Sequence, residues 1–309
     1  MKLLVLLILV LVFATGCAMQ RVPAQAQLPA APTQTHQPAP LKLKIVATNG
    51  HRVLTEKQLI DELAKYNIVC VGEIHDSELH HRVQLEIIQG LSAHRGRMGV
   101  GMEMFQRPFQ PDIDRYFAGQ TTEAEFLKAT EYDTRWGFDW QLYSPIVDFA
   151  RANKIPLAAL NAPKELTNRI MKVGYSGLTD DEKRQLGPVD FNVKAHRDFW
   201  YEIIPQMHGA MKPSAQQQER TYEVMTVWDD YMAQSVASFY HDRHLRRLVV
   251  LAGSGHIDGG FGIPDRAAKY AHAKRATVKT VIGDQSADGS DDGLPTDYTI
   301  YVLPDDKQP

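Results

Sequence analysis

Cysteine is scarce in this chain, because only Cys17 and Cys70 occur among its 309 residues. Cys17 lies in the leader described below, which leaves Cys70 alone in the apolar run "NIVCVG". We therefore expect no disulfide within the chain. A cysteine inside an apolar strand is usually inert packing, and this is the role we predict for Cys70.

An excess of charge of one sign is also missing, because the formal net charge is only −3. Nucleic-acid binding needs a strongly basic surface, so nothing in the composition favours a nucleic-acid partner. The sequence further lacks the GxSxG nucleophile elbow, the P-loop, the GxGxxG fingerprint, the HExxH zinc helix and the CxxCH haem-attachment motif. These absences argue against serine esterase chemistry and against covalently attached c-type haem.

The apolar run at the N-terminus is too short to span a membrane, because Leu3 to Phe13 is eleven residues and a spanning helix needs ~20. Lys2 before this run and small residues after it are typical of a secretory signal peptide, which we place at residues 1–16. The stretch "ATGC", ending in Cys17, resembles the bacterial lipobox, in which the cysteine is lipidated and becomes the new N-terminus. Ordinary signal cleavage with an incidental Cys17 is the alternative.

The residue after the cysteine bears on the expected location. Ala18 at this position resembles Gram-negative lipoproteins that are sorted to the outer membrane. We therefore expect a protein that is lipid-anchored in the bacterial envelope, in the outer membrane and facing the periplasm.

A composition shift separates the leader from the folded part. Residues 18–41 are rich in Pro, Gln and Ala and have little to bury, so together with Cys17 they predict a tether over residues 17–41. About 260 residues follow, which suits one large domain or two small ones. We assign this domain to residues 42–304, with a short tail over 305–309.

Apolar runs rich in branched residues predict seven strands. The clearest are residues 67–72, 98–104, 155–160 and 248–252, and weaker runs lie at 43–47, 277–282 and 298–303. Continuous apolar strands that alternate with helical patterns are typical of a mostly parallel sheet covered on both faces. We therefore predict an α/β fold with a mostly parallel sheet flanked by helices.

Two helices show clear apolar spacing. In "SELHHRVQLEIIQGLSAH" the residues Leu79, Val83, Ile87 and Leu91 form one stripe, and "DWQLYSPIVDFARANK" gives a second helix. Residues 195–244 are mostly helical, with interruptions expected at Pro205 and Pro213. This block is long for a simple crossover, so we predict a helical insertion or lid.

Polar residues lie at the ends of four of the predicted strands. They are Glu73 with His75, then Glu103, Asn161 and His256. Ligands of open α/β sheets bind beyond the carboxyl ends of the strands, so these side chains are predicted to converge in one crevice. Each also has a purely structural alternative, such as helix capping by Glu73 or Asn161.

Two carboxylates in such a crevice need compensation, because each buried ion costs several kcal/mol. A shared proton, an arginine such as Arg107 or Arg135, or a metal cation would supply it. Two carboxylates with two imidazoles suit Mn, Fe or Zn, or a general acid–base pair that acts on water. The glycines in "GSGHIDGG" are expected to let the chain leave the sheet and direct His256 into the crevice.

Five blocks of the sequence resemble the ChaN-like haem-binding lipoprotein family. They are "VGEIHD", "GMEMFQRPFQPDIDRYFAG", "WGFDWQLYSPIVDFARANKIPLAALNAP", "VWDDYMAQSVA" and "GSGHIDGGFGIPDR". The resemblance covers about residues 43–282 and implies an α/β domain that binds haem non-covalently. It also implies a role in haem or iron acquisition, an outer-membrane haem receptor as partner, and a homodimer.

The wider clan of that family includes Tiki-type metalloproteases and erythromycin esterases. Their shared features correspond to Glu73, His75, Glu103 and His256 of this chain. The alternative function is therefore a metal-dependent hydrolase that holds a divalent metal with these four residues. No catalytic residue is assigned on the haem-binding interpretation.

Candidate axial haem ligands lie mainly in "HRDFWYEIIPQMHGAM", because haem iron takes His, Tyr, Cys or Met. We consider His196, Tyr201 and His208 from this stretch, and Tyr143 from the preceding helix. The structural alternative is an amphipathic helix that packs Phe199, Ile203 and Met207 into the core.

Overall fold

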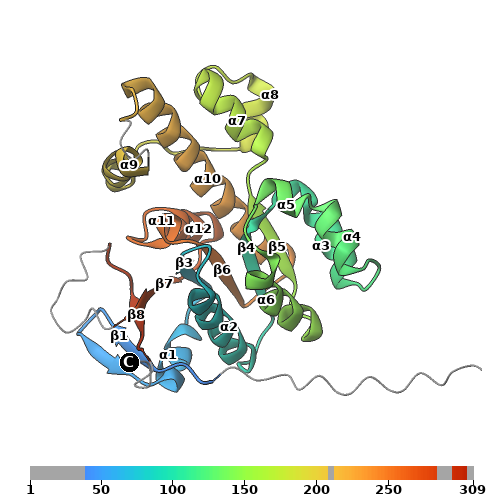
Figure 1. Ribbon diagram of the computed structural model, residues 1–309, viewed down its shortest axis with the longest axis vertical. Coiled ribbons are helices and arrows are strands. Elements are labelled where there is room, and N and C mark those ends of the chain that lie inside the picture. Colours follow the sequence, from blue (N-terminus) through green and yellow to red (C-terminus); the bar gives the residue numbers. More distant parts are fainter. Residues whose placement is uncertain (1–38, 208–211, 284–293, 305–309) are drawn as a thin grey trace, which may run out of the picture. The chain divides into compact units, whose positions relative to one another are not determined.

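The computed structural model describes residues 39–207, 212–283 and 294–304. The signal peptide, Cys17, almost all of the tether, the short tail and His208 lie outside these residues. From Leu41 onward the chain forms one unit. Figure 1 shows its central sheet with helices on both sides.

The described residues contain one eight-stranded sheet in the order β2-β1-β8-β7-β3-β6-β4-β5. The strands from β8 to β5 in this order pair in parallel, and β1 and β2 extend the sheet by antiparallel pairs. The predicted α/β class with a mostly parallel sheet is therefore confirmed. The strands are β1 Leu43–Ala47, β2 Arg52–Leu54, β3 Ile68–Glu73, β4 Met98–Gln106, β5 Leu157–Asn161, β6 Arg247–Gly253, β7 Arg275–Ile282 and β8 Tyr298–Val302.

The two faces of the sheet belong to different apolar clusters. Val69 and Val71 of β3 point into the cluster under α2 and α6, whereas Ile68 and Cys70 point into the cluster under α10 and α12. This division follows from the alternation of side chains along a strand. Cys70 is fully buried, and burial raises the pKa of its thiol, so it is the inert packing residue predicted above.

Twelve α-helices and one 3₁₀ turn connect the strands within the described residues. They are α1 Glu56–Leu63, α2 Glu78–Ser92, η1 Arg107–Phe109, α3 Gln110–Phe117, α4 Glu123–Ala129, α5 Tyr132–Arg135, α6 Trp140–Ala152, α7 Lys164–Val173, α8 Asp180–Leu186, α9 Lys194–Met207, α10 Ala215–Asp242, α11 Ser254–Ile257 and α12 Ile263–Ala271. The predicted stripe on α2 is present, because Val83, Ile87 and Leu91 are buried.

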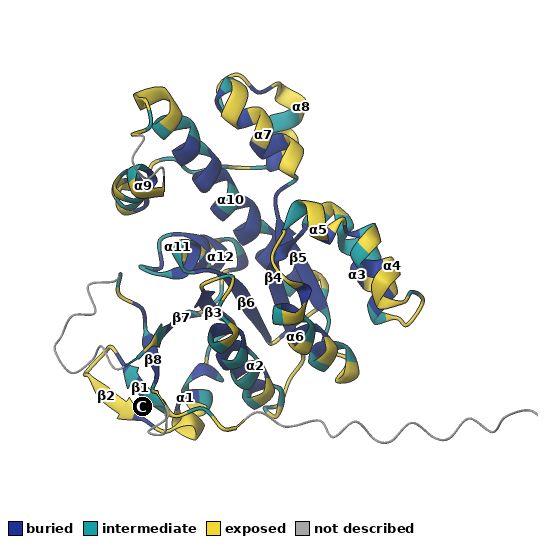
Figure 2. Ribbon diagram, viewed as in Figure 1, coloured by how far each residue is buried: buried dark blue, intermediate teal, exposed yellow. Residues whose placement is uncertain are grey.

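The long crossover between β5 and β6 consists of α7, α8, α9 and α10, and the helical insertion predicted over residues 195–244 corresponds to α9 and α10. Pro205 lies inside α9 and does not end it before Met207. Proline has no N–H to offer the carbonyl of Tyr201, and the side-chain amide of Gln218 donates to that carbonyl instead, at 2.9 Å. The middle of α10 is buried, whereas its first turns are exposed (Figure 2). None of the described helices is both long enough and apolar enough to cross a membrane.

Candidate functional site

A pocket of about 580 Å³ lies at the carboxyl ends of β3, β6, β4 and β5, which are neighbours in the sheet. Five residues predicted to share a crevice line it, namely Glu73, His75, Glu103, Asn161 and His256. Arg135 also lines the pocket. Arg107 is not part of the lining, because its guanidinium lies over the ring of Tyr231, 3.4 Å from the ring centroid.

Glu73 is the centre of the first hydrogen-bond network. Its carboxylate accepts from Nδ1 of His75 at 2.9 Å, from Nε2 of Gln84 at 2.8 Å and from the hydroxyl of Tyr143 at 3.1 Å. Burial alone would raise the pKa of Glu73, but the hydrogen bonds from His75 and Gln84 and the ion pair with His81, whose Nδ1 lies 3.4 Å away, outweigh burial and lower it to about 2. Glu73 is therefore a buried carboxylate that stays ionised.

His81 supplies the positive charge that balances this carboxylate. Gln84 uses its amide N–H₂ on Glu73, so its oxygen must accept from Nδ1 of His81, at 3.1 Å. Nε2 of His81 faces the carbonyl oxygen of His75 at 3.1 Å, and a carbonyl can only accept. Both ring nitrogens of His81 therefore donate, which requires the imidazolium form. Burial lowers the pKa of His81, but the bond to Glu73 and its charge raise it overall.

His75 is held at one nitrogen and free at the other. Its Nδ1 donates to Glu73, whereas its Nε2 makes no hydrogen bond with a described residue. The ring packs against both Trp136 and Phe138, with centroid distances of 4.8 and 5.0 Å. An imidazole with Nδ1 fixed on a carboxylate and Nε2 free in a pocket is the usual arrangement of a histidine that ligates a metal.

A second network surrounds His256. Nδ1 of His256 is 2.7 Å from Asp229, and Nε2 of His196 is 2.7 Å from the other oxygen of the same carboxylate. Burial would raise the pKa of Asp229, but the two histidines lower it to about 2. Burial likewise lowers the pKa of His256, but the charges of Asp229 and Glu103 raise it to about 9. His256 is therefore an imidazolium at neutral pH.

Glu103 and Asn161 complete the polar floor. One oxygen of Glu103 accepts from the backbone N–H of Gly253 at 2.8 Å, and the other is 3.6 Å from Nε2 of His256. Asn161 donates to the carbonyl of Glu103 at 3.0 Å and accepts from the N–H of Ala162 at 2.8 Å. Asn161 thus braces the strand end and does not cap α7, whose N-cap is Pro163.

Glycine is required at the last position of β6, Gly253, by the close approach of His75. A Cβ at Gly253 would lie 2.9 Å from Cε1 and 3.1 Å from Nε2 of that ring. The expected result for Gly253→Ala is a displaced His75 ring and a loss of about 1–3 kcal/mol in the free energy of unfolding. Urea unfolding checks the loss, and an unchanged histidine resonance of His75 in NMR spectra would contradict the displacement.

The other side chains that line the pocket are largely apolar, and two cationic side chains lie among them. Side chains of Trp136, Phe138, Trp200, Met207, Met225 and Trp228 contribute, and Arg135 and Lys164 add positive charge. Arg135 is paired with Glu131 and Glu165, while Nζ of Lys164 donates to the carbonyl of Thr134 at 2.8 Å. A flat apolar molecule with anionic groups fits this combination.

The four predicted haem-ligand candidates lie as follows. Tyr143 is fully buried and its hydroxyl donates to Glu73, and His196 is fully buried against Asp229. The hydroxyl of Tyr201 hydrogen-bonds Glu219 and Arg197. None of these three lines the pocket, and His208 lies outside the described residues.

The alternative of a divalent-metal site finds no support in the part of the chain that the structure describes. No group of three or more His, Cys, Asp or Glu side chains there is arranged to hold a metal ion. The two networks explain why these side chains do not form a metal site. Glu73 already accepts hydrogen bonds from three donors, and Nδ1 of His256 is paired with Asp229.

A family model described as "Haem-binding uptake, Tiki superfamily, ChaN" matches residues 59–267, which is about two thirds of the chain. This chain belongs to the ChaN family. The resemblance noted in the sequence is therefore confirmed, and the two networks above are features of a ChaN protein in a haem-binding family.

The chain is also similar to several individual proteins. The solved structure of ChaN of Campylobacter jejuni, described as showing cofacial haem binding, has a TM-score of 0.68 and 20% identity, covering 84% of this chain and 98% of that one. A variant of erythromycin esterase EreC has a TM-score of 0.44 and 10% identity, covering 85% and 83%. The chloroplastic protein RETICULATA-RELATED 5 of Arabidopsis thaliana is 22% identical over 238 residues, or 72% of this chain. The chain spans only about a third of that relative.

Sequence reasoning missed several residues of this ChaN site. Asp229 lies in the middle of α10, and His81 and Gln84 lie on the buried side of α2. One signal was available, since "HHRVQ" places polar residues on the same side of the helix as Val83 and Ile87. Polar residues on a core-facing stripe need buried partners, and here the partner is Glu73.

Proposed function

We propose that this chain binds haem non-covalently in the pocket and that Nε2 of His75 is the axial ligand of the iron. The observation that carries the proposal is the orientation of His75, whose Nδ1 donates to Glu73 while Nε2 has no partner among the described residues. A neutral imidazole is the commonest axial ligand of haem, and a carboxylate on its other nitrogen makes it more basic.

The rest of the lining fits the macrocycle. The pocket volume of about 580 Å³ lies within the ~300–1,000 Å³ range of small-molecule sites. Trp136, Phe138, Trp200 and Trp228 offer aromatic faces and edges for a flat apolar ring. Arg135 and Lys164 would pair with the two propionates, since both are cations on the lining. Bound haem would supply an iron atom with open axial positions, and the chain would supply the ligand and the apolar cover.

We further propose that the protein is lipid-anchored through Cys17 in the outer membrane, faces the periplasm, and serves haem or iron acquisition. The "ATGC" stretch and Ala18 support the anchor, and the family description of haem-binding uptake supports the role. An outer-membrane haem receptor as partner follows from the same role. A homodimer is proposed because cofacial haem binding is described for ChaN of Campylobacter jejuni.

The test is a haemin titration of the chain from residue 18 onward, followed by its Soret band. We expect a saturable red-shifted band at one haemin per chain, and a clearly weaker complex with iron-free protoporphyrin, because the porphyrin alone cannot use His75. A linear rise in absorbance without saturation, as for haemin in buffer, would contradict haem binding. Equal affinity for both porphyrins would contradict iron ligation.

A further inference from the structure

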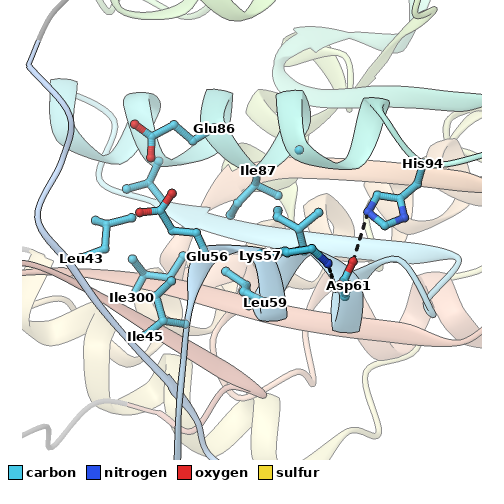
Figure 3. Close-up of a pocket in the computed structure, with 13 residues that line it drawn as sticks. Leu43, Ile45, Glu56, Lys57, Leu59, Asp61, Glu86, Ile87, His94 and Ile300 are labelled. Atoms are coloured by element: carbon cyan, nitrogen blue, oxygen red, sulfur yellow. Dashed lines mark hydrogen bonds and ion pairs between the residues drawn. The ribbon is translucent and has the colours of Figure 1, made fainter.

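A second cavity, of about 470 Å³, lies between α1, α2 and the antiparallel edge of the sheet. Figure 3 shows it in close-up, with α1 and α2 lying alongside β1 and β8. It shares no lining residue with the haem pocket. Its floor is aliphatic and consists of Leu43, Ile45, Leu59, Ile60, Val83, Ile87 and Ile300. Among the described residues, no Phe, Tyr or Trp side chain lines it.

The two ends of this groove differ in charge. At one end Nζ of Lys57 is 2.6 Å from Asp61, and Nε2 of His94 is 3.8 Å from the same carboxylate, so the acid is balanced. At the other end the side chains of Glu56 and Glu86 lie near each other (Figure 3). Neither of these two carboxylates has a hydrogen bond or ion pair with a described residue.

The carboxylate of Glu86 is in an unfavourable environment. Burial raises its pKa, and the charge of Glu56 raises it further, against a smaller opposing effect of Arg82. A half-buried acid at the end of an aliphatic groove, with a second acid beside it, would be stabilised by a cation that enters the groove. The aliphatic floor requires that this cation carry an apolar chain.

We propose that the groove binds an amphiphile that has a single alkyl chain and an ammonium head group. The chain lies over Leu59, Ile87 and Ile300, and the ammonium lies between Glu56 and Glu86. Charge complementarity selects this ligand over a fatty acid, whose carboxylate would meet the two acids. It also selects against a plain hydrocarbon, which would leave both carboxylates unpaired.

The test compares decylamine with decanoate, which have the same chain length and opposite charge at pH 7. Calorimetric titration of the chain from residue 18 onward is expected to show decylamine binding at least about tenfold tighter than decanoate. Glu86→Gln keeps the size of the side chain and is expected to weaken decylamine binding about tenfold while leaving decanoate binding unchanged or stronger. The matched control is Glu78→Gln, an exposed acid on the same helix that does not line the groove.

Three results would overturn the proposal. Equal affinity for the two probes would show that charge does not select the ligand. If Glu86→Gln and Glu78→Gln change the affinity for decylamine equally, decylamine binds outside the groove. If decylamine binds only after residues 18–38 are replaced by a Gly-Ser linker of equal length, the groove belongs to the chain's own N-terminal segment.

Discussion

Replacing Asp229 with alanine is expected to lower the free energy of unfolding by about 3–5 kcal/mol at pH 7. The carboxylate is fully buried and lies 2.7 Å from a ring nitrogen of both His196 and His256. Its removal leaves the imidazolium of His256 without its main counter-ion in a buried site. An uncompensated buried charge costs far more than the original pair contributes, which is why the expected loss is large.

Urea unfolding of the wild type and two variants measures this loss. Asp198→Asn is the matched control, since Asp198 is an exposed acid on α9 and its pair with Lys194 lies at the surface. We expect the control to stay within about 0.5 kcal/mol of the wild type. If the free energy of unfolding of Asp229→Ala lies within about 1 kcal/mol of that of the control, the difference is on the order of the extrapolation uncertainty. The buried charge pair then does not stabilise the fold.

The same cluster makes the free energy of unfolding depend on pH. The pKa of His256 rises from 6.5 to about 9 in the folded state, so the folded state holds this proton more tightly. That stabilisation is fully present below pH 6.5 and is lost as the pH rises through 9, and it corresponds to about 3 kcal/mol. Asp229→Ala should remove most of this pH dependence, because the charge of Asp229 is the chief cause that raises the pKa.

The sheet could be predicted from the sequence because its central strands are buried on both faces. Such strands are continuous apolar runs, and the four clearest runs became β3, β4, β5 and β6. Their boundaries shifted by one or two residues, as is usual at element ends. The three-residue strand β2 was missed, since Arg52 and Val53 are exposed and "RVL" is too short to show a pattern.

The convergence of polar residues at the strand ends could be predicted for a similar reason. Parallel neighbours end at one edge of the sheet, so Glu73, Glu103 and Asn161 had to lie near each other. The partner of His256 could not be predicted, because Asp229 comes from a helix buried on most of its surface. The neighbouring Asp230 is equally buried but pairs with Arg266. The sequence alone does not show which of these two adjacent aspartates points to the pocket.

The free nitrogen of His75 was also beyond sequence reasoning. The stretch "GEIHD" places Glu73 and His75 two residues apart, but only the fold shows that Nδ1 donates to the carboxylate. Trp136 and Phe138 reach this ring from the loop between α5 and α6. Long-range packing thus decides which histidine can act as a ligand. It favours His75, which the sequence places in the polar crevice and not among the candidate haem ligands.

Replacing His75 with alanine is expected to weaken haemin binding at least about 100-fold and to change the Soret band. The variant loses an imidazole whose Nε2 has no hydrogen-bond partner among the described residues, while Glu73 keeps the bonds from Gln84 and Tyr143. The fold should therefore persist, which far-UV circular dichroism checks. Added imidazole should enter the vacated space and restore the wild-type Soret band, because it supplies the same ligand atom.

His241→Ala is the matched control for this experiment, since His241 is exposed at the end of α10 and does not line the pocket. The affinity should also fall as the pH is lowered, in the wild type and in the control but not in His75→Ala. Burial lowers the pKa of His75, but the bond to Glu73 and the charge of Glu103 raise it overall, and a protonated Nε2 cannot bind iron. If His75→Ala keeps the wild-type affinity and band, another side chain ligates the iron. In that case Glu73 and His81 form a structural pair whose role is to hold the strand end against α2.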